Sequence, residues 1–208
     1  MYAKFFKRII DCVLSFMALM VFFSFLLVFA VVGAIVMKGN PFFVQKRPGK
    51  KDKKGQEKIF GLIKFRTMTC EKDADGNLLP DDKRLTKYGK FLRSTSLDEL
   101  PELINIFLGD MAIVGPRPLL VEYLPRYSEE QRARHNVRPG LTGYAQAYGR
   151  NSLTWEEKFK KDIYYVNNLS FILDVKIVYR TVWIVLKQEG INSKTSVTME
   201  EFKGTKSE

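Results

Sequence analysis

The hydrophobic pattern begins with one long apolar run, residues 12–37, which holds 26 residues without a charge. This exceeds the roughly 20 apolar residues that an α-helix needs to cross a bilayer. The run is apolar on all sides, which argues against a helix packed on the core of a water-soluble domain. It is also long for a signal peptide, and no clear A-x-A cleavage site follows it. We therefore predict a membrane-associated helix within residues 1–37.

Both flanks of this helix are basic. Lys4, Lys7 and Arg8 precede it, and residues 38–66 hold ten Lys or Arg and two acids. Basic flanks favour the cytoplasmic side, so both ends are drawn to the same side of the membrane. We predict a re-entrant helix that turns back inside the bilayer, and a single crossing is the alternative. Ser24 lies near the middle, where it could bond a carbonyl freed at a bend.

Shorter patterns follow in residues 38–190, which we take as the catalytic domain, ahead of a polar tail at 191–208. Two short strands are predicted at 42–45 and 58–65, joined by a polar turn. Loops are predicted at 70–86 and 109–118. Helical patterns cover 86–93, 97–108, 119–135 (broken at Pro125), 154–167 and 171–187. The fold class is thus α-rich α+β, with a re-entrant membrane helix, a small β-hairpin and a cytoplasmic helical domain.

The last of these helices, 171–187, is strongly apolar. It is either a core helix or an amphipathic helix on the membrane surface, and the sequence leaves both open. We include interfacial amphipathic helices in the predicted fold.

Composition narrows the partners. The 208 residues carry 34 Lys or Arg against 23 Asp or Glu, a net charge of +11, which favours an anionic partner. No nucleic-acid motif is present, and the basic stretch adjoins the membrane helix, so we expect anionic phospholipid and a phosphorylated substrate rather than nucleic acid. The two cysteines, Cys12 and Cys70, match no metal spacing and favour a reducing compartment. His135 is the only histidine, which excludes multi-histidine metal sites.

Residues 94–118, STSLDELPELINIFLGDMAIVGPRP, hold the candidate chemistry. Ser96-x-x-Glu99 has the spacing of a helix capping box, a structural explanation for one acid. Asp98 and Glu99 would then lie in the first turn of a helix. The functional explanation gives the pair two tasks, because one carboxylate can attack phosphorus while its neighbour holds Mg²⁺. Arg117, fixed between two prolines, has the planar guanidinium that suits phosphate.

Several stretches, in order, resemble the small monotopic phosphoglycosyl transferases of bacteria, the PglC-like initiating sugar-phosphate transferases. They cover most of the chain. They are KRIIDCVLS (7–15), FFVQKRPG (42–49), IKFRTM (63–68), 93–120, RPGLTGYAQAYGRN (138–151) and 159–177.

The resemblance implies an enzyme that takes a UDP-sugar. Asp98 attacks the sugar-bearing phosphate, UMP leaves, and polyprenyl (undecaprenyl) phosphate then takes the phospho-sugar from the enzyme. The product is a polyprenyl-diphosphate sugar, the first membrane intermediate of glycoconjugate synthesis. The tail and overall size most resemble enzymes that use a modified amino sugar such as UDP-diacetylbacillosamine. The implied location is the cytoplasmic face of the bacterial inner membrane, where other glycan-pathway enzymes are potential partners.

The resemblance also implies roles for residues. Glu99 helps to place Mg²⁺, the expected cofactor. Candidate contacts to phosphate or nucleotide are Lys64, Arg66, Arg93, Arg117, Arg138 and Arg150. The family pattern implies a re-entrant helix broken at a Ser-Pro pair, but here Phe25 follows Ser24, so any break forms without proline. Two other functions stay open: a non-catalytic membrane scaffold, and a lipid-phosphate hydrolase.

Overall fold

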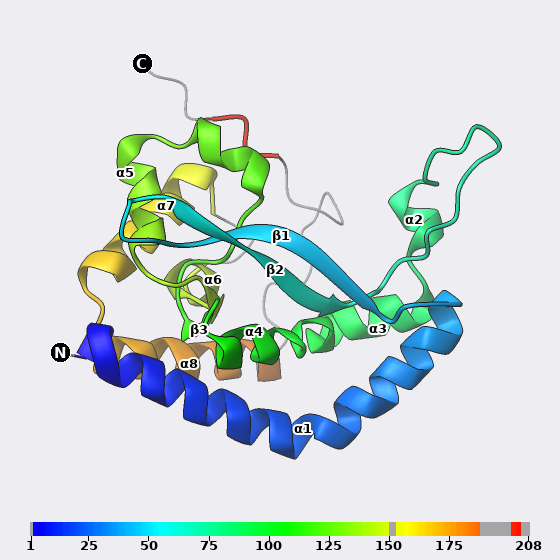
Figure 1. The fold of residues 1–208 in the computed structure, drawn as a ribbon, viewed down its shortest axis with the longest axis horizontal. Helices are drawn as coiled ribbons and strands as arrows, with labels where there is room; N and C mark the ends of the chain where they lie inside the picture. The colour runs from blue at the N-terminus through cyan, green and yellow to red at the C-terminus, as the bar shows by residue number, and fades with distance from the viewer. Residues whose placement is uncertain (1, 150–152, 188–200, 205–208) are drawn as a thin grey trace.

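The computed structural model of the chain describes residues 2–149, 153–187 and 201–204 (Figure 1). The strands are β1 (Phe42–Lys51), β2 (Glu57–Phe65), β3 (Ala112–Val114) and β4 (Gly140–Thr142). The π- and 3-10 helices are η1 (Tyr2–Phe6), η2 (Leu97–Glu99), η3 (Val121–Arg126) and η4 (Ala133–Asn136). The α-helices are α1 (Lys7–Met37), α2 (Asp81–Arg84), α3 (Lys87–Thr95), α4 (Glu102–Leu108), α5 (Glu129–Arg132), α6 (Tyr144–Ala147), α7 (Trp155–Asn167) and α8 (Phe171–Lys187). The helix-rich α+β fold with one small hairpin is as predicted.

Helix α1 is long, apolar and mostly exposed, and it is the one helix in the described part of the chain that could cross a membrane by length and composition. It is bent near its middle, and both ends approach the rest of the molecule (Figure 1). Near the N-terminal end, Arg8 donates to the carbonyls of Ile106 and Phe107, each at 2.7 Å. Near the other end, the Tyr88 hydroxyl donates to the Phe29 carbonyl at 2.7 Å. Both halves of the bent helix are therefore tied to the rest of the domain, and the bend forms without proline.

The β-hairpin pairs β1 with β2 antiparallel, from Phe42 opposite Phe65 to Lys51 opposite Glu57. It is longer than predicted at its first strand, which continues through Pro48 to an irregularity before Lys51. The side-chain amide of Asn105 joins α4 to β2, since it accepts from the Ile63 N–H at 3.0 Å and donates to the Gly61 carbonyl at 2.8 Å. This places α4 directly beside the hairpin.

The segment around the two acids differs from the prediction. Ser96 has a left-handed backbone, φ 58°, and ends α3 instead of starting the next helix. Its side chain makes no capping hydrogen bond, so the capping box is wrong. The predicted helix 97–108 is divided into η2 and α4, with Pro101 between them, because proline has no N–H to continue a helix.

The chain from 109 to 142 also departs from the prediction. Strand β3 lies within the predicted loop 109–118 and pairs in parallel with β4, a strand that was not predicted. A Cβ on Gly115 would lie 2.3 Å from the Arg138 carbonyl oxygen, and one on Gly140 would lie 2.1 Å from the Gly115 nitrogen. Only glycine fits this close approach. The predicted helix 119–135, broken at Pro125, is instead three short pieces, η3, α5 and η4. The first piece, η3, continues through Pro125, and the break falls at Tyr127 and Ser128, whose backbones are extended.

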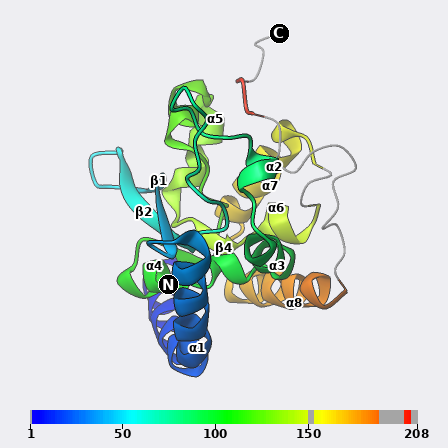
Figure 2. The same ribbon diagram turned by 90° about the vertical axis from the view of Figure 1, so that its right-hand side faces the viewer.

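Helices α7 and α8 match their predicted ranges closely. Asp174 of α8 accepts from Lys7 at 2.6 Å and from Tyr165 of α7 at 2.7 Å, which joins α8 to the start of α1 and to α7. Ile177 is fully buried, whereas Ile172 and Tyr179 are exposed. Helix α8 is thus half core helix and half surface helix. It lies on the same lower side of the molecule as α1 (Figure 2).

Part of the predicted polar tail packs on the domain. Phe202 is 1% exposed and joins an aromatic cluster with Tyr123, Tyr127 and Phe159. Arg126 pairs with Glu201 at 2.6 Å and also donates to the Phe202 carbonyl. Residues 201–204 are therefore part of the folded domain.

Candidate active site

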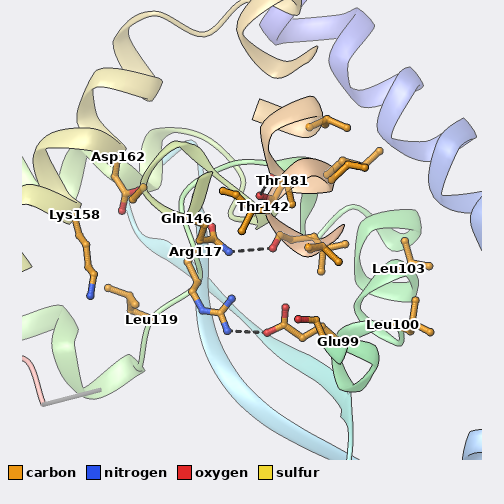
Figure 3. Close-up of a pocket in the computed structure, with 18 of the residues that line it drawn as sticks. Glu99, Leu100, Leu103, Arg117, Leu119, Thr142, Gln146, Lys158, Asp162 and Thr181 are labelled. Atoms are coloured by element: carbon orange, nitrogen blue, oxygen red, sulfur yellow. Dashed lines mark hydrogen bonds and ion pairs between the residues drawn. The ribbon is translucent and has the colours of Figure 1, made fainter. Parts of the chain in front are cut away.

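A cavity of about 770 Å³ lies between η2 and α4 on one side and α7 and α8 on the other (Figure 3). Glu99, Arg93 and Arg117 give one part of its wall a strong charge. Another part is apolar and includes three valines of α8 (Val178, Val182 and Val185) and two residues of α1, Ala18 and Phe22. Arg134, Lys158 and Asp162 also line the cavity, which therefore has charged walls and, at α8 and α1, a hydrocarbon-like side.

The Asp98–Glu99 pair lies on η2 at the charged side. Glu99 Oε1 accepts from Lys64 Nζ of β2 and from Arg117 Nη2, both at 2.7 Å. Lys64 also pairs with Glu102 of α4 at 3.1 Å. Strand β2, residues 99–102 and the loop of Arg117 thus meet in one network of charges, and three of its members (Glu99, Lys64, Arg117) were predicted.

The surroundings shift the pKa values of Glu99 and Glu102 in opposite directions. Burial alone would raise the pKa of Glu99, but Arg117 and Lys64 outweigh it and hold that pKa well below the usual range. Burial, together with the charge of Glu99, raises the pKa of Glu102. The Glu99 and Glu102 charges raise the pKa of Arg117 further. Glu99 is therefore a firmly ionised carboxylate between two cations, while Glu102 holds its proton more readily.

Asp98 lies beside this network and not among the residues that line the cavity. Burial, then the charge of Glu99, raises the pKa of Asp98, while Lys64, Arg117 and Arg93 oppose the rise. The positive charges of these three residues thus act on the carboxylate that the sequence nominates as the nucleophile. Positive charge near Asp98 favours the approach of a phosphate.

Arg117 is positioned through its backbone as well as its side chain. Its loop lies between Pro116 and Pro118, and its carbonyl accepts from Arg134 Nη2 at 2.8 Å. Arg134 in turn pairs with Asp162 of α7 at 2.7 Å, and these side chains are 2% and 5% exposed. A buried ion pair therefore fixes the loop that carries Arg117.

The other predicted phosphate contacts are dispersed. Arg93 lines the cavity, and its Nε donates to Thr67 Oγ1 at 3.1 Å. Arg66 is not among the lining residues, and its guanidinium lies 3.8 Å from Cys70 Sγ. Arg138 donates to the Gly109 carbonyl at 2.8 Å, just beyond α4 and away from the cavity. Arg150 lies outside the described residues.

Sequence reasoning missed several lining residues. Gln146 and Lys158 both line the cavity (Figure 3). Burial, then the charge of Arg117, lowers the pKa of the Lys158 ammonium. Thr142 of β4 and Thr181 of α8 share a hydrogen bond of 2.7 Å in the same wall. Lys158 and Asp162 fall at or next to the stretch 159–177 that carries the family resemblance, which was the available signal.

The side chains at the site can be compared with the ligands that the expected Mg²⁺ needs. Among the described residues, no group of three or more His, Cys, Asp and Glu side chains forms a metal-binding cluster. Mg²⁺, however, is commonly bound through one or two carboxylates and the phosphates of a substrate. Asp98 and Glu99 supply such oxygens, so the residues present fit a magnesium ion that a diphosphate brings or completes.

Comparisons with known proteins agree with this chemistry. A family model described as bacterial sugar transferase matches residues 2–188. The chain is 51% identical over 183 residues to a protein of Bacillus subtilis named uncharacterized sugar transferase EpsL, with 88% of each chain covered. It is 38% identical over 188 residues to the UDP-glucose:undecaprenyl-phosphate glucose-1-phosphate transferase of Klebsiella pneumoniae, covering 86% of this chain and 39% of that one.

A further relative is 33% identical over 194 residues. It is the UDP-N-acetylgalactosamine-undecaprenyl-phosphate N-acetylgalactosaminephosphotransferase of Aeromonas hydrophila, with 89% of this chain and 45% of that one covered. The chain thus spans less than half the length of each of these last two relatives.

Proposed function

Since the chain belongs to the bacterial sugar transferase family and is a phosphoglycosyl transferase, we propose that it moves a phospho-sugar from a UDP-sugar to polyprenyl (undecaprenyl) phosphate. The products are polyprenyl-diphosphate sugar and UMP. The observation that carries the proposal is the Asp98–Glu99 pair, with Glu99 held by Lys64 and Arg117, beside a cavity with a charged side and an apolar side.

In the first half-reaction, a carboxylate oxygen of Asp98 attacks the phosphorus that bears the sugar. The bond from that phosphorus to the oxygen shared with UMP breaks, and UMP leaves with the electron pair. Arg117, Arg93 and Lys64 lie where they can offset the charge on the phosphoryl oxygens. A covalent aspartyl phospho-sugar remains on the enzyme.

In the second half-reaction, a phosphate oxygen of the polyprenyl phosphate attacks the same phosphorus. The bond to Asp98 breaks, and the free carboxylate is restored. The same cations serve both steps, because each step places a phosphate at the same position. A single anion-binding site is therefore sufficient for two anionic substrates taken in turn.

Glu99 is the residue that would help to hold Mg²⁺, the proposed cofactor, together with the phosphates of the substrate. When bound, Mg²⁺ neutralises phosphate charge and favours departure of the nucleotide. Lys64 and Arg117 keep Glu99 ionised and hold it in one orientation, so that its carboxylate is ready for a cation.

The long apolar helix and the family indicate membrane association. We propose a re-entrant α1 in the bacterial inner membrane, with residues 38–190 on the cytoplasmic face. Arg8 and Tyr88 tie the two halves of α1 to one domain, and this supports a helix whose ends are on the same side of the bilayer. The exposed apolar residues of α8, with Lys176, Arg180 and Lys187, suit an interfacial helix. Single cysteines at Tyr2 and Gly39 should both react with a membrane-impermeant thiol reagent from the cytoplasmic side alone, in a background without Cys12 and Cys70; labelling of one from each side would contradict re-entry.

The identity of the sugar in the UDP-sugar is a further, more specific part of the proposal. We propose a modified amino sugar such as UDP-diacetylbacillosamine, as the family resemblance of the sequence implies. Relatives are named as glucose, galactose and N-acetylgalactosamine enzymes, so a panel of UDP-sugars must include those donors. The donor that gives the highest kcat/KM for UMP release identifies the sugar.

The test of the function is UMP release from a UDP-sugar panel, with and without polyprenyl phosphate. We expect multiple turnovers only with the lipid, and loss of activity in Asp98→Asn. Asp110→Asn is the matched control, because Asp110 pairs with Lys58 outside the cavity. Continuous turnover without lipid would support the hydrolase, and no turnover with any donor despite retained membrane binding would support the scaffold.

A further inference from the structure

The two half-reactions proposed above use the charged groups of the cavity and give its apolar side no role. We propose, resting on the function proposed above, that this side binds the first isoprene units of the acceptor lipid, which reach it from the bilayer between α1 and α8. The polar groups at the other side then hold the phosphate of the same lipid. The proposed subsite binds hydrocarbon, and its walls come from α8 and α1.

The first wall is one face of α8. Val178, Val182 and Val185 recur at helical spacing and line the cavity together with Thr181. Each of the three valines also keeps a substantial exposed fraction, 37%, 51% and 44%. A residue that both lines a cavity and is exposed marks an opening. This wall is therefore apolar and open to the surroundings of α8.

The second wall comes from α1. Ala18 and Phe22 line the cavity, and both lie on α1, the helix that is long and apolar enough to cross a membrane. Phe22 is 40% exposed. Lys7 and Asp174 join the first turns of α1 and α8 at 2.6 Å, so the two helices start together and both continue to the cavity. An apolar opening between two such helices faces lipid when α1 lies in the membrane.

The charged end completes the site. Glu99, Arg117 and Arg93 line the same cavity as the valines of α8. A polyprenyl phosphate has this same division, a phosphate at one end of a hydrocarbon chain. A water-soluble nucleotide sugar does not, since its polar groups are spread along its length. The division of the walls thus matches the acceptor more closely than the donor.

The volume sets how the substrates share the space. About 770 Å³ lies within the range of roughly 300–1,000 Å³ that a single small-molecule site occupies. The donor and the acceptor head therefore occupy the charged end in turn, and only the acceptor uses the apolar side. A block on the apolar side should harm the second half-reaction and spare the first.

Val182→Trp is the test, with Val175→Trp as its matched control. Both valines lie on α8 with 51% exposure, but only Val182 lines the cavity. Two readouts are needed: the single equivalent of UMP released without lipid, and kcat/KM for acceptors of two and of eleven isoprene units. We expect Val182→Trp to release its UMP equivalent like the parent enzyme. Its kcat/KM for both acceptors should fall by about tenfold or more, and Val175→Trp should keep the parent values.

The proposal is overturned if Val182→Trp keeps parent kcat/KM for both acceptors, or if Val175→Trp loses as much as Val182→Trp, which would indicate a general effect on membrane binding. If Val182→Trp releases no UMP, Val185→Trp decides by the same two readouts. Failure of the proposed function is distinct, because the parent enzyme itself would then release no UMP or transfer nothing to either acceptor.

Discussion

For the ion pair between Arg134 and Asp162, we predict that replacing both side chains restores stability without restoring activity. The two side chains are almost fully buried and meet at 2.7 Å, and Arg134 also donates to the Arg117 carbonyl at 2.8 Å. Asp162→Leu removes the counter-ion and leaves a guanidinium in the core. Breaking one partner of a buried pair costs about 3–5 kcal/mol.

The magnitude can be converted to a melting temperature. For a chain of this size, 1 kcal/mol shifts Tm by about 2–4 °C. Asp162→Leu should therefore lower Tm by roughly 6–20 °C. The double variant Arg134→Met/Asp162→Leu removes both charges, and replacing a buried pair with apolar groups is often neutral or stabilising. Its Tm should return to within about 3 °C of the parent value, a shift of about 1 kcal/mol.

Activity should not return with stability. In the double variant the Arg117 carbonyl has lost its donor, so the loop that aims Arg117 at the phosphate is no longer fixed. Misplacement of a positioning group by about 1 Å can cost about 100-fold in rate. We expect UMP release to stay at least about tenfold below the parent rate. Thermal unfolding in lipid nanodiscs and the UMP assay on the same preparation measure both. Recovery of full activity in the double variant would refute a positioning role for Arg134, and an unchanged Tm in Asp162→Leu would refute the buried pair.

Three further predictions follow from single contacts. Tyr88→Phe removes the 2.7 Å bond to the Phe29 carbonyl, worth about 1 kcal/mol, so amide exchange in the second half of α1 should quicken by about fivefold; unchanged exchange would contradict the tie. Burial, then the charge of Arg134, lowers the pKa of His135 to about 3, so activity should show no step near pH 6.5. The free energy of unfolding should fall as the pH drops from about 6.5 toward 3, because the unfolded chain takes up the proton first. The same pH dependence of unfolding in His135→Gln would argue against this. Burial and the charge of Glu99 raise the pKa of Glu102, so the folded protein should lose stability as the pH rises above the pKa that this carboxyl has in the unfolded chain. Glu102→Gln should therefore be at least as stable as the parent at about pH 7. A lower free energy of unfolding for this variant in denaturant would contradict the prediction.

The elements that the sequence predicted well are those set by local pattern. Helices α7 and α8 have strong periodicity, and α7 begins with a complete capping box at Thr154 and Glu157. The hairpin has two apolar strands around a polar turn. The same capping rule failed at Ser96, because Pro101 and the left-handed Ser96 backbone allow only a short 3-10 turn there. Local spacing cannot reveal which of two competing signals wins.

What the sequence could not predict rests on long-range pairing. Strands β3 and β4 are three residues each and lie 28 positions apart, too short for a pattern to mark them. In the site, Asp98, Glu99, Lys64 and Arg117 were found through their residue types and the family resemblance. Arg138 is an arginine like Arg117, yet its guanidinium donates to the Gly109 carbonyl outside the cavity. Residue type alone does not separate an arginine that binds the backbone from one that lines the site.

The most direct test of the central claim is the intact mass of the purified enzyme after incubation with UDP-sugar and Mg²⁺ in the absence of polyprenyl phosphate. The proposed mechanism predicts an adduct of one phospho-sugar on the parent enzyme, no adduct on Asp98→Asn, and loss of the adduct when polyprenyl phosphate is added. The mass of the adduct also identifies the sugar. An enzyme that stays unmodified with every donor, yet releases UMP once the lipid is present, would contradict the covalent mechanism and would leave Asp98 a role in binding a cation.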